Sequence, residues 1–258
     1  MNKYITNISL IDINKELCGQ AGVLKFEKFK TIPIKPETNY IVPKILHFIW
    51  IGSPVSYIYV KNILTFVATN KDNYTYKLWV DHYTPDIDGV LICDVRKEFL
   101  QDDQFINRNI YDIEPNWGAK ADILRYEIIY REGGIFTDID AISVKPFDIY
   151  FQRSFVSHIG EPYNDICNGI FGFPAGSNYL KYVINCLKEV RTYNYDYASL
   201  PTKLRICLLT GPILFRQCFE FYNDPNIQMI SQQILTLSKD NPDAYTYHTY
   251  DSTWWDKK

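Results

Sequence analysis

The segment REGGIFTDIDAISVKPFD, residues 131–148, places Asp138 and Asp140 one residue apart after a short apolar run. Side chains at positions i and i+2 of an extended strand end point to the same side, so the two carboxylates can share one site. Ionised carboxylates in a site of low dielectric constant need a partner of opposite charge. Oxygen ligands favour Mg²⁺ or Mn²⁺, which keep positions free for substrate phosphates. The spacing predicts a cation site for a metal–diphosphate substrate, and a solvated turn is the alternative.

A second charged pair lies in the segment immediately before, EPNWGAKADILRYEIIYREGG. Its apolar spacing predicts a helix, on which Asp122 and Arg125 share one face at i and i+3, and Gly133 supplies a left-handed stop. Because this helix runs directly into the D-x-D segment, it carries the pair toward the two aspartates. The alternative is an exposed ion pair within the helix, worth ~0.2–0.5 kcal/mol.

Strands and helices alternate along the chain around these residues. The pattern predicts strands in the segments KILHFIWI, YKLWVD, GIFTDID, SFVSHIG and DICNGIFGFP. It predicts helices in the segments SPVSYIYVKNILTFVATN, DVRKEFLQDDQF and TGPILFRQCFEFYN and over residues 178–191. Alternation of this kind predicts an α/β fold. Residues 43–258 are expected to form one domain, preceded by a poorly specified N-terminal extension over residues 1–42 with a short amphipathic helix near residues 13–29.

Composition excludes several classes of protein. The 258 residues are 47% hydrophobic, which is typical of a globular, soluble protein with a buried core. A net charge of −3 argues against a binder of phosphate backbones, so nucleic acid is not an expected partner. His47 and Pro54 interrupt the most apolar region, which is shorter than the ~20 residues of a membrane span. We expect no transmembrane segment and a cytoplasmic location, with attachment to a membrane only through an acceptor or partner.

Three segments in order, KILHFIWIG, KLWVD and NWGAKADILRYEIIYREGGIFTDIDAISVKPFD, resemble a family of sugar transferases with a D-x-D motif. This family includes yeast-type initiating α-mannosyltransferases, bacterial capsule glycosyltransferases and the glycosyltransferase domains of large clostridial toxins. The resemblance covers residues 43–148 most strongly. It implies the GT-A fold, a single Rossmann-like, nucleotide-binding α/β sandwich with a mixed, mostly parallel sheet.

The resemblance also implies how the donor is bound. Trp50, which closes the first predicted strand, would stack on the nucleotide base, with a core position as the alternative. Asp122 and Arg125 would hold hydroxyls of the donor sugar, and Asp138 would hold sugar and ribose hydroxyls. Asn168, in the segment CNGIFGFPAG, matches an asparagine beside the donor sugar, with a turn as the alternative.

The metal site implied by the resemblance uses Mn²⁺ or Mg²⁺. Asp140 would ligate the ion, with Asp138 beside it. The C-terminal segment YHTYDSTWW is similar to the family's closing segment, so His248 and Ser252 are further candidate ligands. One of the two adjacent tryptophans would reach the phosphates, and Trp254 is the candidate.

The implied activity is transfer of a hexose from a UDP- or GDP-sugar to a glycan, a polysaccharide or another acceptor, with retention of anomeric configuration as in the family. Two alternatives come from other classes. A haloacid-dehalogenase-type phosphatase also uses D-x-D, but it places the motif near the start of its fold and needs threonine or valine where this chain has Ile142. A non-catalytic sugar-nucleotide-binding relative would lose the metal ligands, whereas both aspartates are present.

Overall fold

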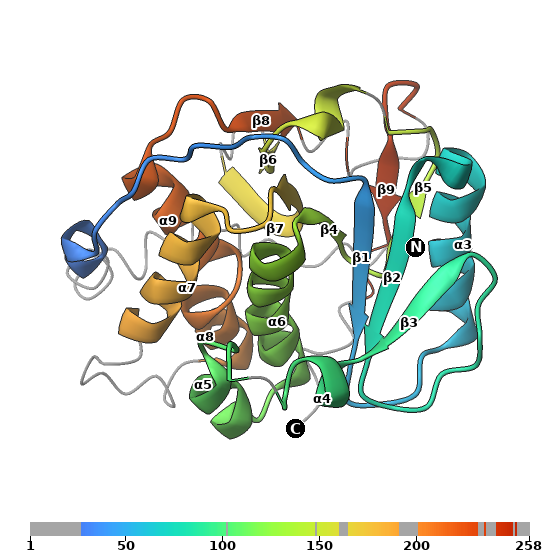
Figure 1. Cartoon of the computed structure of the whole chain (residues 1–258), viewed down its shortest axis with the longest axis horizontal. Helices are drawn as coiled ribbons and strands as arrows, with labels where there is room; N and C mark the ends of the chain where they lie inside the picture. Colours follow the sequence, from blue (N-terminus) through green and yellow to red (C-terminus); the bar gives the residue numbers. More distant parts are fainter. Residues whose placement is uncertain are drawn as a thin grey trace.

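The computed structural model describes residues 27–101, 103–147, 149–159, 165–190, 201–231, 235, 241–249 and 251. Figure 1 shows the arrangement of the helices and strands. In chain order the elements are η1 (Glu27–Thr31), β1 (Ile45–Trp50), α3 (Tyr57–Asn70), η2 (Lys71–Asn73), β2 (Thr75–Val80), β3 (Val90–Asp94), α4 (Val95–Glu98), α5 (Arg108–Ile113), α6 (Trp117–Glu132), β4 (Gly134–Thr137), β5 (Ala141–Ser143), η3 (Ile149–Gln152), β6 (Phe155–Ile159), β7 (Asp165–Phe173), α7 (Asn178–Val190), α8 (Thr202–Leu209), α9 (Pro212–Tyr222), β8 (Gln228–Ser231) and β9 (Thr246–His248).

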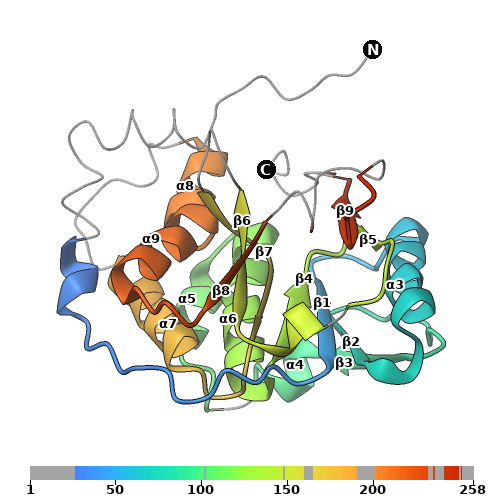
Figure 2. The same cartoon turned by 90° about the horizontal axis from the view of Figure 1, so that it is seen from above.

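A seven-stranded sheet in the order β3-β2-β1-β4-β7-β6-β8 forms the centre of the molecule. The pairs β1–β2, β2–β3, β1–β4 and β6–β8 are parallel, whereas β7 is antiparallel to both β4 and β6. Helices α6, α7 and α9 cover one face of the sheet and α3 covers the other (Figures 1 and 2). Each face has its own cluster of buried apolar side chains. The predicted α/β sandwich with a mixed, mostly parallel sheet is confirmed.

Helix α6 has the boundaries that its sequence predicts. The Asn116 side chain caps it by accepting the backbone N–H of Ala119 at 3.1 Å. At the other end Gly133 adopts a φ of 68°, a left-handed value that glycine accepts without strain, and its N–H donates to the Ile129 carbonyl at 2.9 Å. The chain therefore reverses direction directly into β4, which ends at the D-x-D motif.

The structure corrects the predicted course of the D-x-D segment. The predicted strand GIFTDID ends at Thr137, and Asp138 to Asp140 form a turn between β4 and β5. β5 leaves the large sheet and pairs with β9, with Ala141 opposite His248. The two carboxylates face the same side because of this turn and the pairing of β5 with β9. A strand pleat does not orient them.

Further parts of the chain differ from the sequence-based expectation. β3 occupies residues where the sequence pattern indicated a loop, and α5, α8 and β8 were not expected. The helix predicted in DVRKEFLQDDQF is reduced to the short α4. Of the predicted helix over residues 13–29, only the part from residue 27 is described, as η1, and residues 13–26 lie outside the described part of the chain. Phe29 and Val42 are buried among the core side chains, while the division into residues 1–42 and 43–258 stays a prediction.

Among the residues that the structure describes, the helices are too short or too polar to cross a membrane.

A buried histidine joins β1 to the end of α6. His47 accepts the indole N–H of Trp79 at its Nδ1 atom (3.1 Å), so its proton sits on Nε2, which donates to the Gly133 carbonyl at 2.9 Å. The imidazole is fully buried, and burial lowers the pKa of His47 to about 3. A second proton, on Nδ1, would face the indole N–H of Trp79, so that two donors would oppose each other. The fold therefore holds His47 as one neutral tautomer.

This histidine makes the fold sensitive to acid. The pKa of His47 is about 3 in the folded chain against its ordinary value of 6.5, so protonation favours the unfolded chain below pH 6.5. The contribution of His47 to the free energy of unfolding is expected to fall by about 1.4 kcal/mol for each pH unit in this window. Urea unfolding from pH 7 to pH 5 measures it. His47→Gln should show a shallower pH dependence than wild type, while His82→Gln, at an exposed histidine, should not; equal slopes in His47→Gln and wild type would contradict the assignment.

Candidate active site

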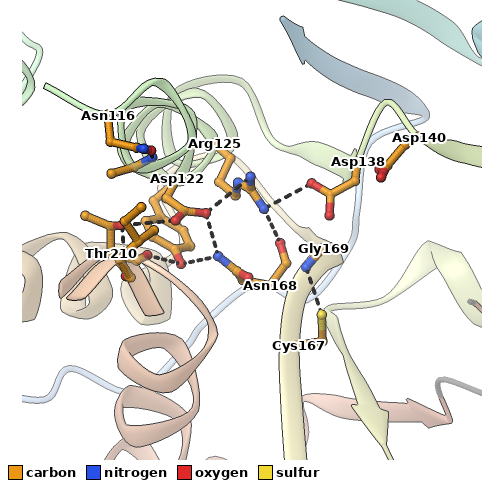
Figure 3. A network of polar contacts seen from close by, with 12 residues as sticks. Asn116, Asp122, Arg125, Asp138, Asp140, Cys167, Asn168, Gly169 and Thr210 are labelled. Atoms are coloured by element: carbon orange, nitrogen blue, oxygen red, sulfur yellow. Dashed lines mark hydrogen bonds and ion pairs between the residues drawn. The ribbon is translucent and has the colours of Figure 1, made fainter. Parts of the chain in front are cut away.

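The carboxyl ends of β4 and β1 and the middle of β7 meet beside α6, and this region gathers five of the predicted residues, Asp122, Arg125, Asp138, Asp140 and Asn168 (Figure 3). Asp138 follows β4 directly, and its backbone N–H donates to the Gly169 carbonyl on β7 at 2.8 Å. A Cβ atom at Gly169 would lie 2.6 Å from Asp138 Oδ2, so only glycine leaves room for this carboxylate. The two strands thus fix where the first aspartate of the motif lies.

Arg125 connects the two predicted pairs of charges. Its guanidinium lies 3.2 Å from Asp122 Oδ1 and 3.2 Å from Asp138 Oδ1, and it also donates to the Asn168 carbonyl at 2.9 Å. The ring of Phe136 lies 4.3 Å from the guanidinium carbon. The alternative of an exposed intrahelical ion pair is wrong, because Asp122 is only 5% and Arg125 only 8% exposed. The arginine instead holds the carboxylates of α6 and of the D-x-D turn at one position.

Burial sets the electrostatics of this group. Burial raises the pKa of Asp122 to about 6, although the charge of Arg125 and the hydrogen bonds from Thr210 and Asn168 oppose the rise. For Arg125 burial acts to lower the pKa, but the charges of Asp122 and Asp138 outweigh it and raise the pKa above its ordinary value. At neutral pH Asp122 is ionised and Arg125 is positive. Two carboxylates around one cation leave this part of the site with a net negative charge.

Asn168 belongs to the same group, and two residues that the sequence analysis did not single out complete it. The Asn168 amide nitrogen donates to Asp122 Oδ1 and to the Tyr126 hydroxyl, both at 2.9 Å. Thr210, between α8 and α9, donates its hydroxyl to Asp122 Oδ2 at 3.0 Å, and its carbonyl accepts the Tyr126 hydroxyl at 2.8 Å. The signal for Tyr126 is its position, one residue beyond Arg125 and four beyond Asp122 on the same helical face. Thr210 has the weaker signal of preceding the Gly-Pro start of α9.

His248 completes a second cluster, on the other side of Asp138. Pairing of β9 with β5 places His248 Nε2 2.9 Å from Asp140 Oδ1 and 3.4 Å from Asp138 Oδ2. The turn that bears Asp140 is held from the same segment, because its carbonyl accepts both the backbone N–H (2.9 Å) and the hydroxyl (3.0 Å) of Thr249. One ligand atom from each of the three side chains lies within 4.8 Å of the others. The two carboxylates and the imidazole therefore converge on one point.

The raised pKa of His248 indicates that the point between the three side chains favours a positive charge. Burial acts to lower the pKa of His248, but hydrogen bonds to Asp138 and Asp140 and the charges of these groups raise it to about 10. A proton on Nε2 thus occupies the place where the two carboxylates attract positive charge. Carboxylate oxygens with one imidazole nitrogen are a ligand set that suits a divalent cation such as Mn²⁺. The residues present fit the predicted metal.

Trp50 lies at the carboxyl end of β1, next to β4 in the sheet. Its ring stacks at 4.6 Å on Tyr59 with a tilt of 40°, and its indole N–H donates to the Pro54 carbonyl at 3.2 Å. The side chain is partly exposed at the carboxyl end of β1, the strand next to β4, which leads into the D-x-D turn. Stacking of Trp50 on a nucleotide base stays a prediction. Ser252 and Trp254 lie outside the described residues.

Residues 59–158 match the family described as "Glycosyltransferase sugar-binding region containing DXD motif". This range contains Asp122, Arg125, Asp138 and Asp140. The chain is 26% identical over 207 residues to "Inositol phosphoceramide mannosyltransferase 3" of Schizosaccharomyces pombe, a match that covers 76% of this chain and 53% of the relative. The chain therefore spans about half the length of this relative.

Solved structures show the same fold. The structure "PaToxG Glycosyltransferase" superposes with a TM-score of 0.55 at 21% identity, covering 81% of this chain and 79% of that chain. The UDP-bound glycosyltransferase domain from the YGT toxin gives a TM-score of 0.53 at 11% identity, with 75% and 80% covered. The predicted GT-A fold and the resemblance to D-x-D glycosyltransferases are both confirmed.

Proposed function

We propose that this chain, whose residues 59–158 carry the sugar-binding region of D-x-D glycosyltransferases, transfers a hexose from a nucleoside diphosphate sugar to a glycan, polysaccharide or other acceptor. One observation carries the proposal. Asp138 contacts Arg125 at 3.2 Å on one side and His248 at 3.4 Å on the other. A single carboxylate thus joins a buried group suited to sugar hydroxyls to a cluster suited to a cation.

The donor sugar is proposed to lie against the buried group. Arg125 offers N–H donors to hydroxyl oxygens, whereas Asp138 and Asp122 offer acceptors to hydroxyl protons. Trp50 would hold the base at the neighbouring strand end, one strand away from the D-x-D turn. Such contacts fix the orientation of the donor and replace the water around the sugar. A donor held in this way reacts more often before it dissociates.

The predicted Mn²⁺ or Mg²⁺ would be held by Asp138, Asp140 and His248, with Ser252 as a further predicted ligand. When bound, a divalent ion there supplies Lewis-acid stabilisation for the charge of a departing diphosphate. An imidazole ligand favours Mn²⁺ over Mg²⁺, because Mg²⁺ prefers oxygen ligands alone. Arg125, 3.2 Å from Asp138 Oδ1, holds this carboxylate in a fixed position, so the ligand needs no reorganisation during the reaction. Retention of anomeric configuration is proposed from the family resemblance.

The donor is proposed to be a UDP- or a GDP-sugar. The UDP-bound neighbour supports a uridine nucleotide, and the mannosyltransferase relative supports a mannosyl donor. A cytoplasmic location, with contact to a membrane only through an acceptor or partner, is part of the proposal.

Hydrolysis of radiolabelled donors tests the function. The protein with Mn²⁺ is expected to release sugar slowly from at least one of UDP-glucose, UDP-N-acetylglucosamine and GDP-mannose, and EDTA should stop the release. A sugar-nucleotide-binding module would be stabilised by a donor in thermal unfolding without cleaving it. A D-x-D phosphatase would instead cleave p-nitrophenyl phosphate. Absence of both donor hydrolysis and donor-induced stabilisation would contradict the proposal.

Replacing Trp50 by alanine is expected to weaken donor binding more than it slows turnover. Stacking of a base on an aromatic ring is worth ~1–3 kcal/mol and acts in the ground state and the transition state alike. Calorimetric titration with the donor and Mn²⁺ measures the dissociation constant. Tyr57→Ala removes an aromatic ring that is 74% exposed and serves as the control. An unchanged dissociation constant in folded Trp50→Ala would exclude Trp50 from the site.

His248→Ala should raise the Mn²⁺ concentration that gives half-maximal donor hydrolysis by at least about tenfold, because one of the three clustered side chains is lost. A Mn²⁺ titration at saturating donor measures this value. His82→Ala, at an exposed histidine paired with Asp81, is the control and should leave it unchanged. A His248→Ala protein with the Mn²⁺ requirement of wild type would show that His248 is not a ligand.

A further inference from the structure

The orientation of the Asn168 amide is determined by its neighbours. Its nitrogen lies 2.9 Å from Asp122 Oδ1 and 2.9 Å from the Tyr126 hydroxyl oxygen. An ionised carboxylate only accepts hydrogen bonds, so the group facing Asp122 must be the NH₂. Both amide protons are then used. The amide oxygen, Oδ1, has no hydrogen-bond partner among the described residues, although Asn168 is only 4% exposed.

Tyr126 excludes the flipped amide. Its hydroxyl has one proton, and this proton is donated to the Thr210 carbonyl at 2.8 Å. The hydroxyl can therefore only accept from Asn168, which again requires the amide nitrogen on that side. The tyrosine ring is fully buried and is held in place by stacking on Phe215 at 5.5 Å and an angle of 6°.

Thr210 fixes the carboxylate on which this arrangement depends. Its hydroxyl donates to Asp122 Oδ2 at 3.0 Å, while Oδ1 receives Asn168 and Arg125. Both oxygens of Asp122 are thus held by the protein, and the carboxylate cannot rotate without losing a buried hydrogen bond. Thr210 is fully buried between α8 and α9. These two helices thereby contribute to a group that otherwise comes from α6, β4 and β7 (Figure 3).

The unpaired oxygen of Asn168 lies in the part of the site proposed for the sugar. The backbone carbonyl of the same residue accepts Arg125, which also contacts Asp138 (Figure 3). Asn168 Oδ1 is not one of the described side-chain atoms that are fully buried without a partner, so it reaches the surface of the site, where a bound ligand can meet it. A ligand that covers this oxygen without donating a hydrogen bond leaves it unpaired, which is unfavourable by about 1–3 kcal/mol, so the position favours a ligand that brings a donor. Sugar hydroxyls and acetamido N–H groups have this property.

We propose that Tyr126 and Thr210 are positioning residues that keep the Asn168 amide oxygen turned toward the donor sugar, and that this oxygen selects sugars bearing a hydrogen-bond donor there. The inference rests on the proposed glycosyl transfer. Sites built to hydrogen-bond a hydroxyl discriminate strongly against analogues that lack it, because the protein group is left unpaired. Sugar selectivity would then depend on two residues placed behind Asn168, on α6 and at the α8–α9 junction.

Tyr126→Phe and Thr210→Val test the proposal, since each removes one hydroxyl and keeps the shape of the side chain. The probe is whichever of UDP-glucose, UDP-N-acetylglucosamine and GDP-mannose wild type hydrolyses fastest, and its nucleoside diphosphate is the sugar-free control. Each variant should bind the sugar nucleotide about tenfold more weakly while binding the diphosphate with Mn²⁺ as wild type does. Thr210→Ser, which retains the hydroxyl, should restore affinity.

A second measurement uses deoxyfluoro analogues of the same donor, in which fluorine replaces one hydroxyl at a time and removes its proton. At one sugar position wild type should lose about tenfold in affinity, and Tyr126→Phe and Thr210→Val should lose much less. Equal loss of sugar nucleotide and diphosphate binding would show a merely structural role and overturn the proposal, as would unchanged binding of both. If Tyr126→Phe fails to fold, the comparison of Thr210→Val with Thr210→Ser decides. If wild type neither binds nor hydrolyses any donor, the proposed function itself has failed.

Discussion

Replacing Asp140 by asparagine is expected to abolish glycosyl transfer and donor hydrolysis, with a loss of at least about a thousandfold in kcat, while the fold persists. Asparagine keeps the volume of the side chain but removes the negative charge that faces His248 at 2.9 Å. The backbone contacts of the turn remain, because Thr249 bonds the main-chain carbonyl of residue 140. Release of radiolabelled sugar under saturating Mn²⁺ and donor measures the loss.

The matched control is Asp103→Asn, which makes the same chemical change at an exposed aspartate and should leave turnover unchanged. Near-normal, metal-dependent hydrolysis by Asp140→Asn would contradict the assignment of the D-x-D motif. Thermal unfolding without metal should show that both variants are folded, with Asp140→Asn modestly less stable than wild type because His248 loses one of its two carboxylate partners. Loss of the fold in Asp140→Asn alone would instead give the aspartate a structural role.

Replacing Arg125 by methionine should produce the largest loss of stability in this site. Methionine retains the apolar stem over Phe136 but leaves Asp122 buried without its counter-charge. Removal of one partner from a buried ion pair typically lowers the free energy of unfolding by ~3–5 kcal/mol. Urea unfolding at pH 7.5 measures the difference from wild type. Arg96→Met removes an exposed arginine that lies 3.5 Å from Asp94 and should lower the free energy of unfolding by less than about 1 kcal/mol.

The pH dependence of the Arg125→Met variant distinguishes this cause from lost packing. Burial already raises the pKa of Asp122 to about 6 from 3.8, so ionisation of this carboxyl disfavours the folded state as pH rises through that window. Without Arg125 the pKa rises further, and stability keeps falling at higher pH. The difference between the variant and wild type should therefore be smaller at pH 5 than at pH 7.5. A difference independent of pH would attribute the loss to packing alone.

The parts of the fold that the sequence predicted are those with a strong local signal. α6 has an asparagine cap, apolar residues at helical spacing and Gly133 at its end, and the structure retains all three. β3 and α8 have no comparable cap or stop residues. VLICD follows a loop rich in aspartate, proline and glycine and forms a strand because β2 offers a parallel neighbour. Pairing with β2 thus determined β3, and no local pattern indicates this pairing.

The candidate site likewise contains residues that the sequence predicted from their spacing and contacts that it did not predict. Asp122, Arg125, Asp138 and Asp140 lie within one short stretch of sequence, so spacing alone indicated that they share a site. The hydrogen bond from Thr210 to Asp122 joins residues 88 positions apart. The contact of His248 with Asp138 spans 110 positions. Such contacts exist only after the sheet has formed, and His248 became a candidate through resemblance to a family alone.

The small β5–β9 sheet has a consequence for how strongly a cation is held. In the described part of the chain it contains three residue pairs, Ala141–His248, Ile142–Tyr247 and Ser143–Thr246, and one of them brings His248 to the motif. Short, peripheral sheets open more readily than the core, so the complete ligand set exists only in the fraction of molecules with β9 docked. The apparent dissociation constant for the ion is the intrinsic constant divided by that fraction. Substitutions in β9 that never touch the ion thus tune its affinity, and ion and donor stabilise the docked strand in return.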